Sequence, residues 1–205
     1  MPDHSMLSDG TAALVARIRE RERELGRPCV VALDGRSGAG KSTLATSLGQ
    51  ALGACLLEGD DFFAGGVALR SDAPEDRARE CIDWQRQRPV LEALRAGRAT
   101  SYQAFDWDAF DGRLEAESTV VEPRSLVLFE GVYTARPELD DLVDLRVLLH
   151  VSEATRVARL LAREGGIGAW ERQWHDAEEW YFTHVRPPPC FDAILWQPDR
   201  RQEET

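Results

Sequence analysis

The sequence predicts an α/β fold with three layers, in which a central, mostly parallel sheet of five strands lies between helices. Five apolar runs have the length of buried strands, at residues 29–34, 54–58, 125–131, 145–151 and 192–196. Stretches with helical spacing of apolar residues separate several of these runs, which is typical of strand–helix–strand units with parallel strands. Glycines and carboxylates follow the predicted strand ends, where open parallel sheets bind ligands.

A glycine-rich motif follows the first predicted strand. Residues 35–42 read Gly-Arg-Ser-Gly-Ala-Gly-Lys-Ser and match the phosphate-binding P-loop pattern G-x-x-x-x-G-K-[ST]. Leu44, Leu48 and Leu52 continue at helical spacing, so the loop leads into a helix N-terminus that favours anions. The pattern therefore predicts a P-loop NTPase fold that binds ATP. The residues expected to bind ATP are Gly35, Arg36, Ser37, Gly38, Ala39, Gly40, Lys41, Ser42 and Thr43.

Lys41 is the single lysine among the 25 basic residues, and all the others are arginine. A compact ammonium group on a flexible stem can reach the β- and γ-phosphates where a planar guanidinium does not fit. We therefore predict a catalytic role for Lys41. Ser42 has the position that binds Mg²⁺ in P-loop enzymes, so the expected cofactors are ATP and Mg²⁺.

Two further predicted strands end in carboxylates. Asp60 and Asp61 follow the second strand, and a carboxylate beside the γ-phosphate can take the proton of an acceptor hydroxyl. The alternative is that an aspartate after Gly59 only caps a turn. Glu130 ends the third strand, where a buried carboxylate is unfavourable unless it meets a metal, water or a donor. We expect Glu130 to bind Mg²⁺ together with Ser42.

Three arginines share one predicted helix. Arg156, Arg159 and Arg163 are spaced i, i+3 and i+7 within residues 155–164, so they lie on one helix face. The helix follows the fourth strand and precedes a glycine-rich stretch. This order predicts a lid, at about residues 155–175, that closes arginines over phosphates and excludes water. A solvated helix face is the alternative.

The length of 205 residues predicts a single P-loop domain over 1–205. Further expected elements are a helix from Asp9 to about Leu25, a charged loop at 64–76, a helix around Pro89 to Ala96, an extended loop or hairpin at 100–112, a substrate-binding segment over about 64–115, and a polar tail at 198–205.

Charge and composition exclude several classes of protein. A net charge of −11 argues against a nucleic-acid partner. The chain has no apolar run of membrane-spanning length and no leader-like N-terminus, so we expect a cytoplasmic protein without a membrane partner. A guanine-specific switch is excluded, because its Asn-Lys-x-Asp motif needs an asparagine and the chain has none. Homo-oligomer formation is left open.

Together these motifs resemble the uridine kinase-like branch of P-loop small-molecule kinases, which also includes pantothenate kinase and phosphoribulokinase relatives. The resemblance runs from about Val30 to Trp196 and rests on the P-loop and on segments Gly59–Phe63, Ile82–Trp84, Leu128–Gly131 and Thr155–Arg163. It implies that Asp60 is the catalytic base. It also implies that Asp83 and Arg156 contact substrate hydroxyls, and that Arg159 and Arg163 are catalytic contacts to the phosphates.

Family uridine kinases carry a histidine on an aromatic hairpin that helps to recognise the pyrimidine. Residues 102–110 contain no histidine, and Tyr102, Phe105 and Trp107 are the expected substrate contacts instead. The predicted function is ATP-dependent phosphoryl transfer to a hydroxyl of a small molecule, first of all a nucleoside such as uridine or cytidine. The alternatives are another polyhydroxylated or cationic metabolite, which the acidic substrate segment suits, and a nucleotide-binding sensor without catalysis.

Overall fold

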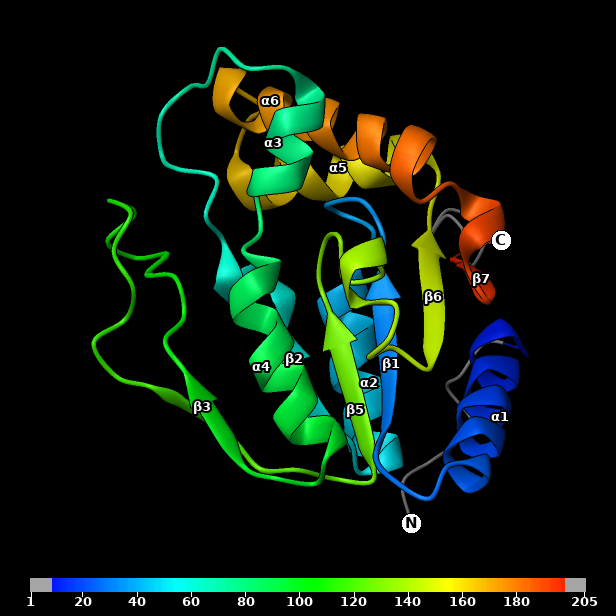
Figure 1. Ribbon diagram of the computed structural model, residues 1–205. Helices are drawn as coiled ribbons and strands as arrows, with labels where there is room; N and C mark the ends of the chain where they lie inside the picture. The colour runs from blue at the N-terminus through cyan, green and yellow to red at the C-terminus, as the bar shows by residue number, and fades with distance from the viewer. Residues whose placement is uncertain (1–8, 198–205) are drawn as a thin grey trace.

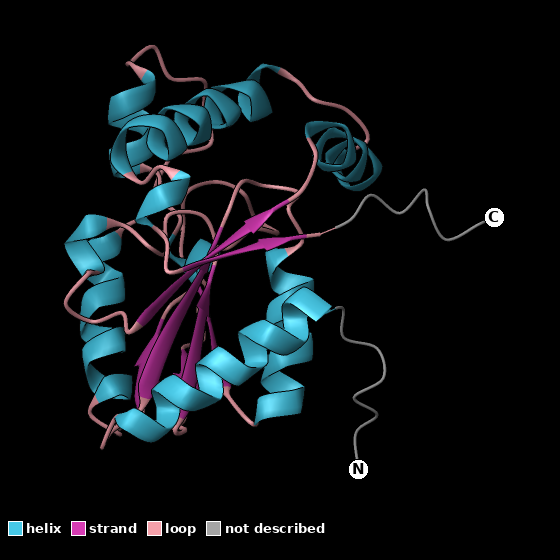
Figure 2. Cartoon of the chain, turned by 90° about the vertical axis from the view of Figure 1, so that its right-hand side faces the viewer, coloured by secondary structure: helices cyan, strands magenta, loops and turns pink. Residues whose placement is uncertain are grey.

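A computed structural model describes residues 9–197, and its centre is a five-stranded sheet with helices on both faces (Figures 1 and 2). The strands, in their order across the sheet, are β2 (Cys55–Glu58), β5 (Leu126–Glu130), β1 (Cys29–Asp34), β6 (Leu145–His150) and β7 (Ala193–Trp196). Every neighbouring pair is parallel. The predicted three-layer P-loop fold is therefore confirmed.

The helices are α1 (Asp9–Glu24), α2 (Lys41–Leu52), α3 (Pro74–Glu80), α4 (Trp84–Arg95), α5 (Glu153–Glu164) and α6 (Ala169–Trp180). Two short strands, β3 (Thr100–Tyr102) and β4 (Thr119–Val121), form a separate antiparallel pair. The tail predicted at 198–205 lies outside the described residues, as do residues 1–8. Within residues 9–197, no helix combines the length and apolar character needed to cross a bilayer.

The two faces of the sheet have separate cores because successive side chains of a strand point to opposite sides. Val31 of β1 and Leu128 of β5 belong to the core that α1 and α2 cover. Val30 and Phe129 belong to the opposite core, where α4 packs. All six residues of β1 are buried, as expected for the central strand of a parallel sheet.

The carboxyl ends of the strands point toward an upper layer made of α3, α5 and α6 (Figure 1). The register pairs Glu130 with both Leu33 and Glu58, so the last residues of β1, β2 and β5 lie at one edge of the sheet. This edge is where the sequence places the phosphate-binding and catalytic groups. The upper layer forms the far wall of the same region.

Two helix boundaries differ from the sequence prediction. α4 begins at Trp84 rather than near Pro89, because the carboxylate of Asp83 caps it by accepting from the Arg86 backbone N–H at 3.1 Å. Pro89 lies inside the helix, where it removes one backbone hydrogen bond at an exposed position. The segment expected to be a loop at 64–76 already enters α3, whose first residue is Pro74.

Because Asp83 caps α4, substitutions of Asp83 test whether its carboxylate has a structural role rather than a substrate-binding role. Asp83→Ala is expected to lower the free energy of unfolding by about 1 kcal/mol, whereas Asp83→Asn retains a capping oxygen and is expected to lower it by a few tenths at most. Urea unfolding followed by circular dichroism measures both variants. Equal destabilisation by Ala and Asn would contradict the cap.

Candidate active site

The P-loop joins β1 to α2 with a backbone that only glycine can follow. Gly35, Gly38 and Gly40 have φ values of 152°, 83° and 96°. A Cβ atom on Gly35 would lie 2.5 Å from the carbonyl oxygen of Leu149, and one on Gly38 would lie 2.9 Å from that of Arg156. α2 has no side-chain cap and no acidic residue in its first turn. The loop therefore offers backbone N–H groups and a positive helix end to phosphates.

The P-loop begins at a fully buried carboxylate, Asp34. Its oxygens accept from the backbone N–H groups of Gly35 at 2.7 Å, Tyr133 at 2.9 Å and Ala135 at 3.0 Å. Burial raises the pKa of Asp34 to about 6, against the lowering effect of these hydrogen bonds. Sequence analysis placed Asp34 at a strand end but gave it no role. The structure shows that it joins the P-loop to the segment that follows β5.

Glu130 and Ser42 form a position suited to a hard cation. Burial raises the pKa of Glu130 to about 7, and the nearby charge of Asp60 adds to the shift, while Lys41 and a hydrogen bond from Ser42 oppose it. The Glu130 Oε2 atom is buried without a hydrogen-bond partner. A cation would offset both unfavourable terms, and carboxylate and hydroxyl oxygens are ligands that Mg²⁺ accepts. These residues fit a magnesium ion.

No group of three His, Cys, Asp or Glu side chains within residues 9–197 is arranged to hold a metal by itself. In P-loop enzymes, phosphate oxygens complete the coordination of Mg²⁺. Ser42 and Glu130 would supply only the protein's share of the ligands.

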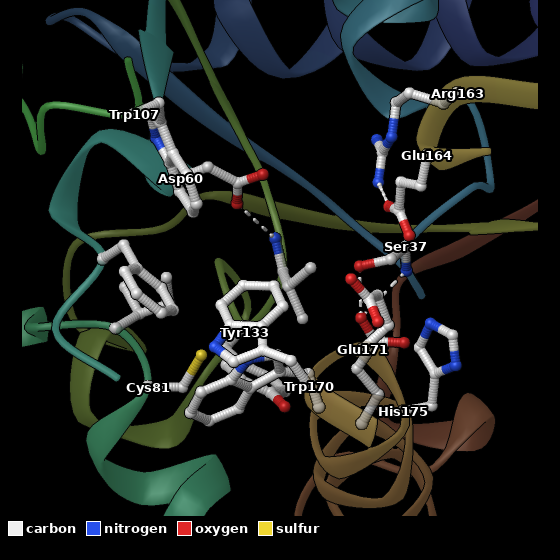
Figure 3. A pocket seen from close by; sticks show the side chains of 15 residues that line it. Ser37, Asp60, Cys81, Trp107, Tyr133, Arg163, Glu164, Trp170, Glu171 and His175 are labelled. Carbon is white, nitrogen blue, oxygen red and sulfur yellow. Dashed lines mark hydrogen bonds and ion pairs between the residues drawn. The ribbon is translucent and has the colours of Figure 1, made fainter. Parts of the chain in front are cut away.

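The two aspartates after β2 point in different directions. Both lie in a 3₁₀ turn, Gly59–Phe62. The Asp60 carboxylate accepts from the Val132 backbone N–H at 3.4 Å and faces a cavity (Figure 3). The Asp61 carboxylate accepts from the Tyr102 hydroxyl at 2.6 Å, and burial raises the pKa of Asp61 although this hydrogen bond lowers it. Of the two, Asp60 is the one open to a ligand.

The cavity beside Asp60 has a volume of about 380 Å³. Five aromatic side chains line it, Phe63, Trp107, Tyr133, Trp170 and Trp174, and they come from four separate parts of the chain. Its polar lining consists of Ser37, Asp60, Arg163, Glu164, Glu171, His175 and Glu178. The cavity therefore lies between the P-loop, the proposed base and α6 (Figure 3).

Only one of the five residues predicted to contact substrate lines this cavity, and it is Trp107. Asp83 caps α4, and Tyr102 is bonded to Asp61. Phe105 is buried and packs edge-on against Phe63 at 5.0 Å. Asp83, Tyr102 and Phe105 thus contact other parts of the protein and not the cavity.

The three arginines of α5 lie in two different places. Arg156 is buried, pairs with Glu153 at 2.6 Å and donates to the Ser37 carbonyl at 3.3 Å. Arg159 donates to the Ala39 carbonyl at 2.9 Å. Arg163 pairs with Glu164 at 2.6 Å and lines the cavity. Arg156 and Arg159 thus contact the backbone of the P-loop itself, and only Arg163 faces the cavity.

Sequence analysis missed the contribution of α6. Trp170 and Trp174 are four residues apart, and Glu178 follows after another four, so all three lie on one helix face. The Glu178 carboxylate accepts from both the backbone N–H, at 3.1 Å, and the hydroxyl of Ser37. The sequence shows this i, i+4, i+8 spacing. It does not show which surface the three side chains contact, because α6 meets the P-loop only in the tertiary structure.

Residues 30–166 match the Phosphoribulokinase / Uridine kinase family. The chain belongs to this family and is an ATP-dependent small-molecule kinase. No curated protein sequence shows significant similarity to it.

Solved structures share the fold at low sequence identity. A possible uridine kinase from Bacillus stearothermophilus has 18% identity and a TM-score of 0.63, with 87% of this chain and 99% of that chain covered. A candidate fructose transport system kinase from Silicibacter sp. TM1040 has 24% identity and a TM-score of 0.66, covering 90% and 98%. A D-glycerate 3-kinase from Cryptococcus neoformans has 15% identity and a TM-score of 0.54, covering 83% and 84%.

The raised pKa of Glu130 predicts a pH-dependent stability. The pKa of this carboxyl is about 7 in the folded chain and 4.5 ordinarily. Between these pH values the folded protein therefore binds more protons than the unfolded chain. The free energy of unfolding should therefore fall as the pH rises through this window, by on the order of 1 kcal/mol or more from this group.

Glu130→Gln is expected to remove that part of the pH dependence. Urea unfolding at the two ends of the window, without nucleotide or Mg²⁺, measures it. A variant whose stability follows pH as the unmodified protein does would show that Glu130 is not the group responsible.

Proposed function

We propose that this kinase transfers the γ-phosphoryl group of ATP to a hydroxyl of a small molecule bound in the aromatic cavity, with Asp60 as the base. One observation carries the proposal. The Asp60 carboxylate lies at the boundary between the cavity and the strand-end region that holds Lys41 and Glu130. An acceptor hydroxyl at this boundary would be in reach of both the base and the phosphate.

The P-loop binds the phosphates in this proposal. Its N–H groups and the N-terminus of α2 bind the triphosphate, and the Lys41 ammonium stabilises charge that develops on the transferred group. Ser42 and Glu130 hold Mg²⁺, which neutralises phosphate charge when it is bound. Arg156 and Arg159 keep the loop in shape through the carbonyls of Ser37 and Ala39.

Asp60 acts on the acceptor. Its carboxylate accepts a hydrogen bond from the acceptor hydroxyl, which orients the oxygen toward the γ-phosphorus, and it takes the proton as the new P–O bond forms. The surrounding aromatic rings exclude water, which limits transfer to water in place of the acceptor.

A nucleoside such as uridine or cytidine is one acceptor to test, because a planar base can stack on the indole and phenyl rings of the cavity. A hydroxylated cationic or polyhydroxylated metabolite is the second, because carboxylates outnumber basic groups in the lining. Acceptor-dependent formation of ADP, screened over nucleosides, sugars and amino alcohols with Mg²⁺, tests the proposal. ADP formation that no acceptor stimulates would contradict it.

The aspartate pair supplies a sharper test. Asp60→Asn should lower kcat by about 10²–10⁴-fold with ATP binding retained, because an amide accepts a hydrogen bond but takes no proton. Asp61→Asn is the matched control, since it changes the same charge in the same turn but faces Tyr102. Steady-state kinetics and nucleotide binding by calorimetry compare them. A larger loss of kcat in Asp61→Asn would assign the base to Asp61.

The arginines of α5 are expected to act through different parameters. Arg159→Ala removes a P-loop contact and should both raise the KM for ATP and lower kcat by at least about tenfold. Arg163→Ala should lower kcat by a similar factor with little change in that KM, because it faces the cavity. Arg172→Ala is the control, since the Arg172 side chain is exposed, lies outside the cavity lining and donates to the Ile167 carbonyl. Arg163→Ala kinetics equal to those of the control would remove Arg163 from the catalytic set.

A further inference from the structure

We infer that the acceptor is an organic cation, a hydroxylated molecule whose positive charge lies on an ammonium group or an N-alkylated ring. The inference rests on the proposed function only in placing the acceptor hydroxyl at Asp60. The charge requirement itself comes from the walls of the cavity, which combine aromatic faces with a buried carboxylate.

Four of the aromatic side chains that line the cavity pack against one another. Phe63 lies 5.0 Å from Trp107 and 5.7 Å from Trp174, measured between ring centroids, and Trp170 lies 5.8 Å from Trp174. The Phe63–Trp174 and Trp170–Trp174 pairs are edge-on. Edge-on packing turns ring faces in different directions, and aromatic faces attract cations through their quadrupoles. Uncharged ligands would gain only stacking and burial here.

Glu178 supplies a countercharge at the inner end of the cavity. It is 2% exposed, and one of its oxygens accepts from Ser37. The other oxygen, Oε2, is buried without a hydrogen-bond partner. Oε2 forms only a long ion pair with the Arg36 Nε atom, at 3.7 Å, because the Arg36 Nη1 atom pairs more closely with Glu179, at 2.7 Å. A buried, incompletely paired carboxylate is unfavourable, and a cationic ligand would offset that term.

The other charged groups around the cavity disfavour an anionic acceptor. Asp60, Glu164 and Glu171 also line it. Arg163 is the single arginine in the lining among the described residues, and it is already paired with Glu164. Burial lowers the pKa of His175, which disfavours a positive charge on its ring. A bound triphosphate adds further negative charge nearby.

Two indole N–H groups indicate which other atoms the ligand carries. The Nε1 atoms of Trp170 and Trp174 are buried without hydrogen-bond partners. Each is a donor only, so each suits a hydroxyl or carbonyl oxygen. A ligand that pairs with Glu178 and with both indole N–H groups therefore carries one positive charge together with neutral oxygen atoms.

Matched pairs of ligands that differ in charge test the inference. Calorimetry without ATP compares choline with its neutral carbon isostere 3,3-dimethylbutan-1-ol, and 3-methylcytidine, which is cationic at neutral pH, with cytidine. D-Glycerate serves as the anion. In at least one pair the cation is expected to bind at least about tenfold more tightly than its neutral partner. Equal binding within both pairs, tighter binding of glycerate, or no cation binding at millimolar concentration would each overturn the inference.

Variants of two acidic residues of α6 assign the effect to the cavity. Glu178→Gln keeps an oxygen for the Ser37 donors but removes the charge, and it should abolish most of the preference for the cation. Asp176→Asn changes the same charge two residues earlier on α6, where the side chain is exposed and outside the cavity, and it should retain the preference. Equal loss in both variants would show that only overall charge matters.

A variant of the exposed residue Trp107 tests the inference if Glu178→Gln does not fold. Trp107 is 43% exposed, so Trp107→Leu is expected to fold, and it should weaken cation binding more than binding of the neutral partner, with recovery in Trp107→Phe. Equal weakening for both partners would contradict the inference. Because binding is measured without ATP, a cation preference without ADP formation would refute the kinase mechanism at Asp60 and leave the charge assignment standing.

Discussion

The active site depends on one buried carboxylate, that of Asp34. It accepts hydrogen bonds from the backbone N–H of Gly35 in the P-loop and from those of Tyr133 and Ala135 after β5. The Tyr181 hydroxyl also donates to it, at 3.5 Å. Tyr181 lies in the π-helical turn that directly follows α6. The phosphate site, the segment after Glu130 and the helix that lines the acceptor cavity are therefore all connected to this carboxylate.

The same network holds an unfavourable backbone conformation. Tyr133 has φ 66°, a left-handed value that costs a non-glycine residue of order 1 kcal/mol or more. Its N–H donates to Asp34, and its ring packs on Tyr181 with centroids 4.5 Å apart. The turn brings Val132 and Tyr133 to the cavity wall beside Asp60. The strain at Tyr133 therefore lies next to Asp60, and strained backbone conformations cluster at functional sites.

The P-loop is also held from its outer side. Arg156 and Arg159 of α5 donate to its carbonyls, and Glu178 of α6 accepts from Ser37. The helices that line the cavity thus also contact the P-loop. A movement of either helix would therefore change the P-loop and the cavity together.

The sequence by itself determined the fold class, the P-loop and the strand-end carboxylates. These features depend on local patterns: strand-length apolar runs, glycines at fixed spacing and a polar residue at the end of a buried strand. Asp60 and Glu130 could be singled out because a strand's direction places its last residue at the ligand-binding edge of the sheet.

The acceptor cavity was decided only by tertiary structure. Of the substrate contacts expected from sequence, Trp107 alone lines it, while Asp83 caps a helix and Tyr102 bonds to Asp61. Trp174 and Glu178 come from α6, more than a hundred residues beyond Asp60 in the chain. The chain's local pattern shows that these side chains share a helix face, but not which surface the face meets. That depends on how α6 packs above the sheet, and on contacts such as Glu178 to Ser37 that link residues far apart in sequence.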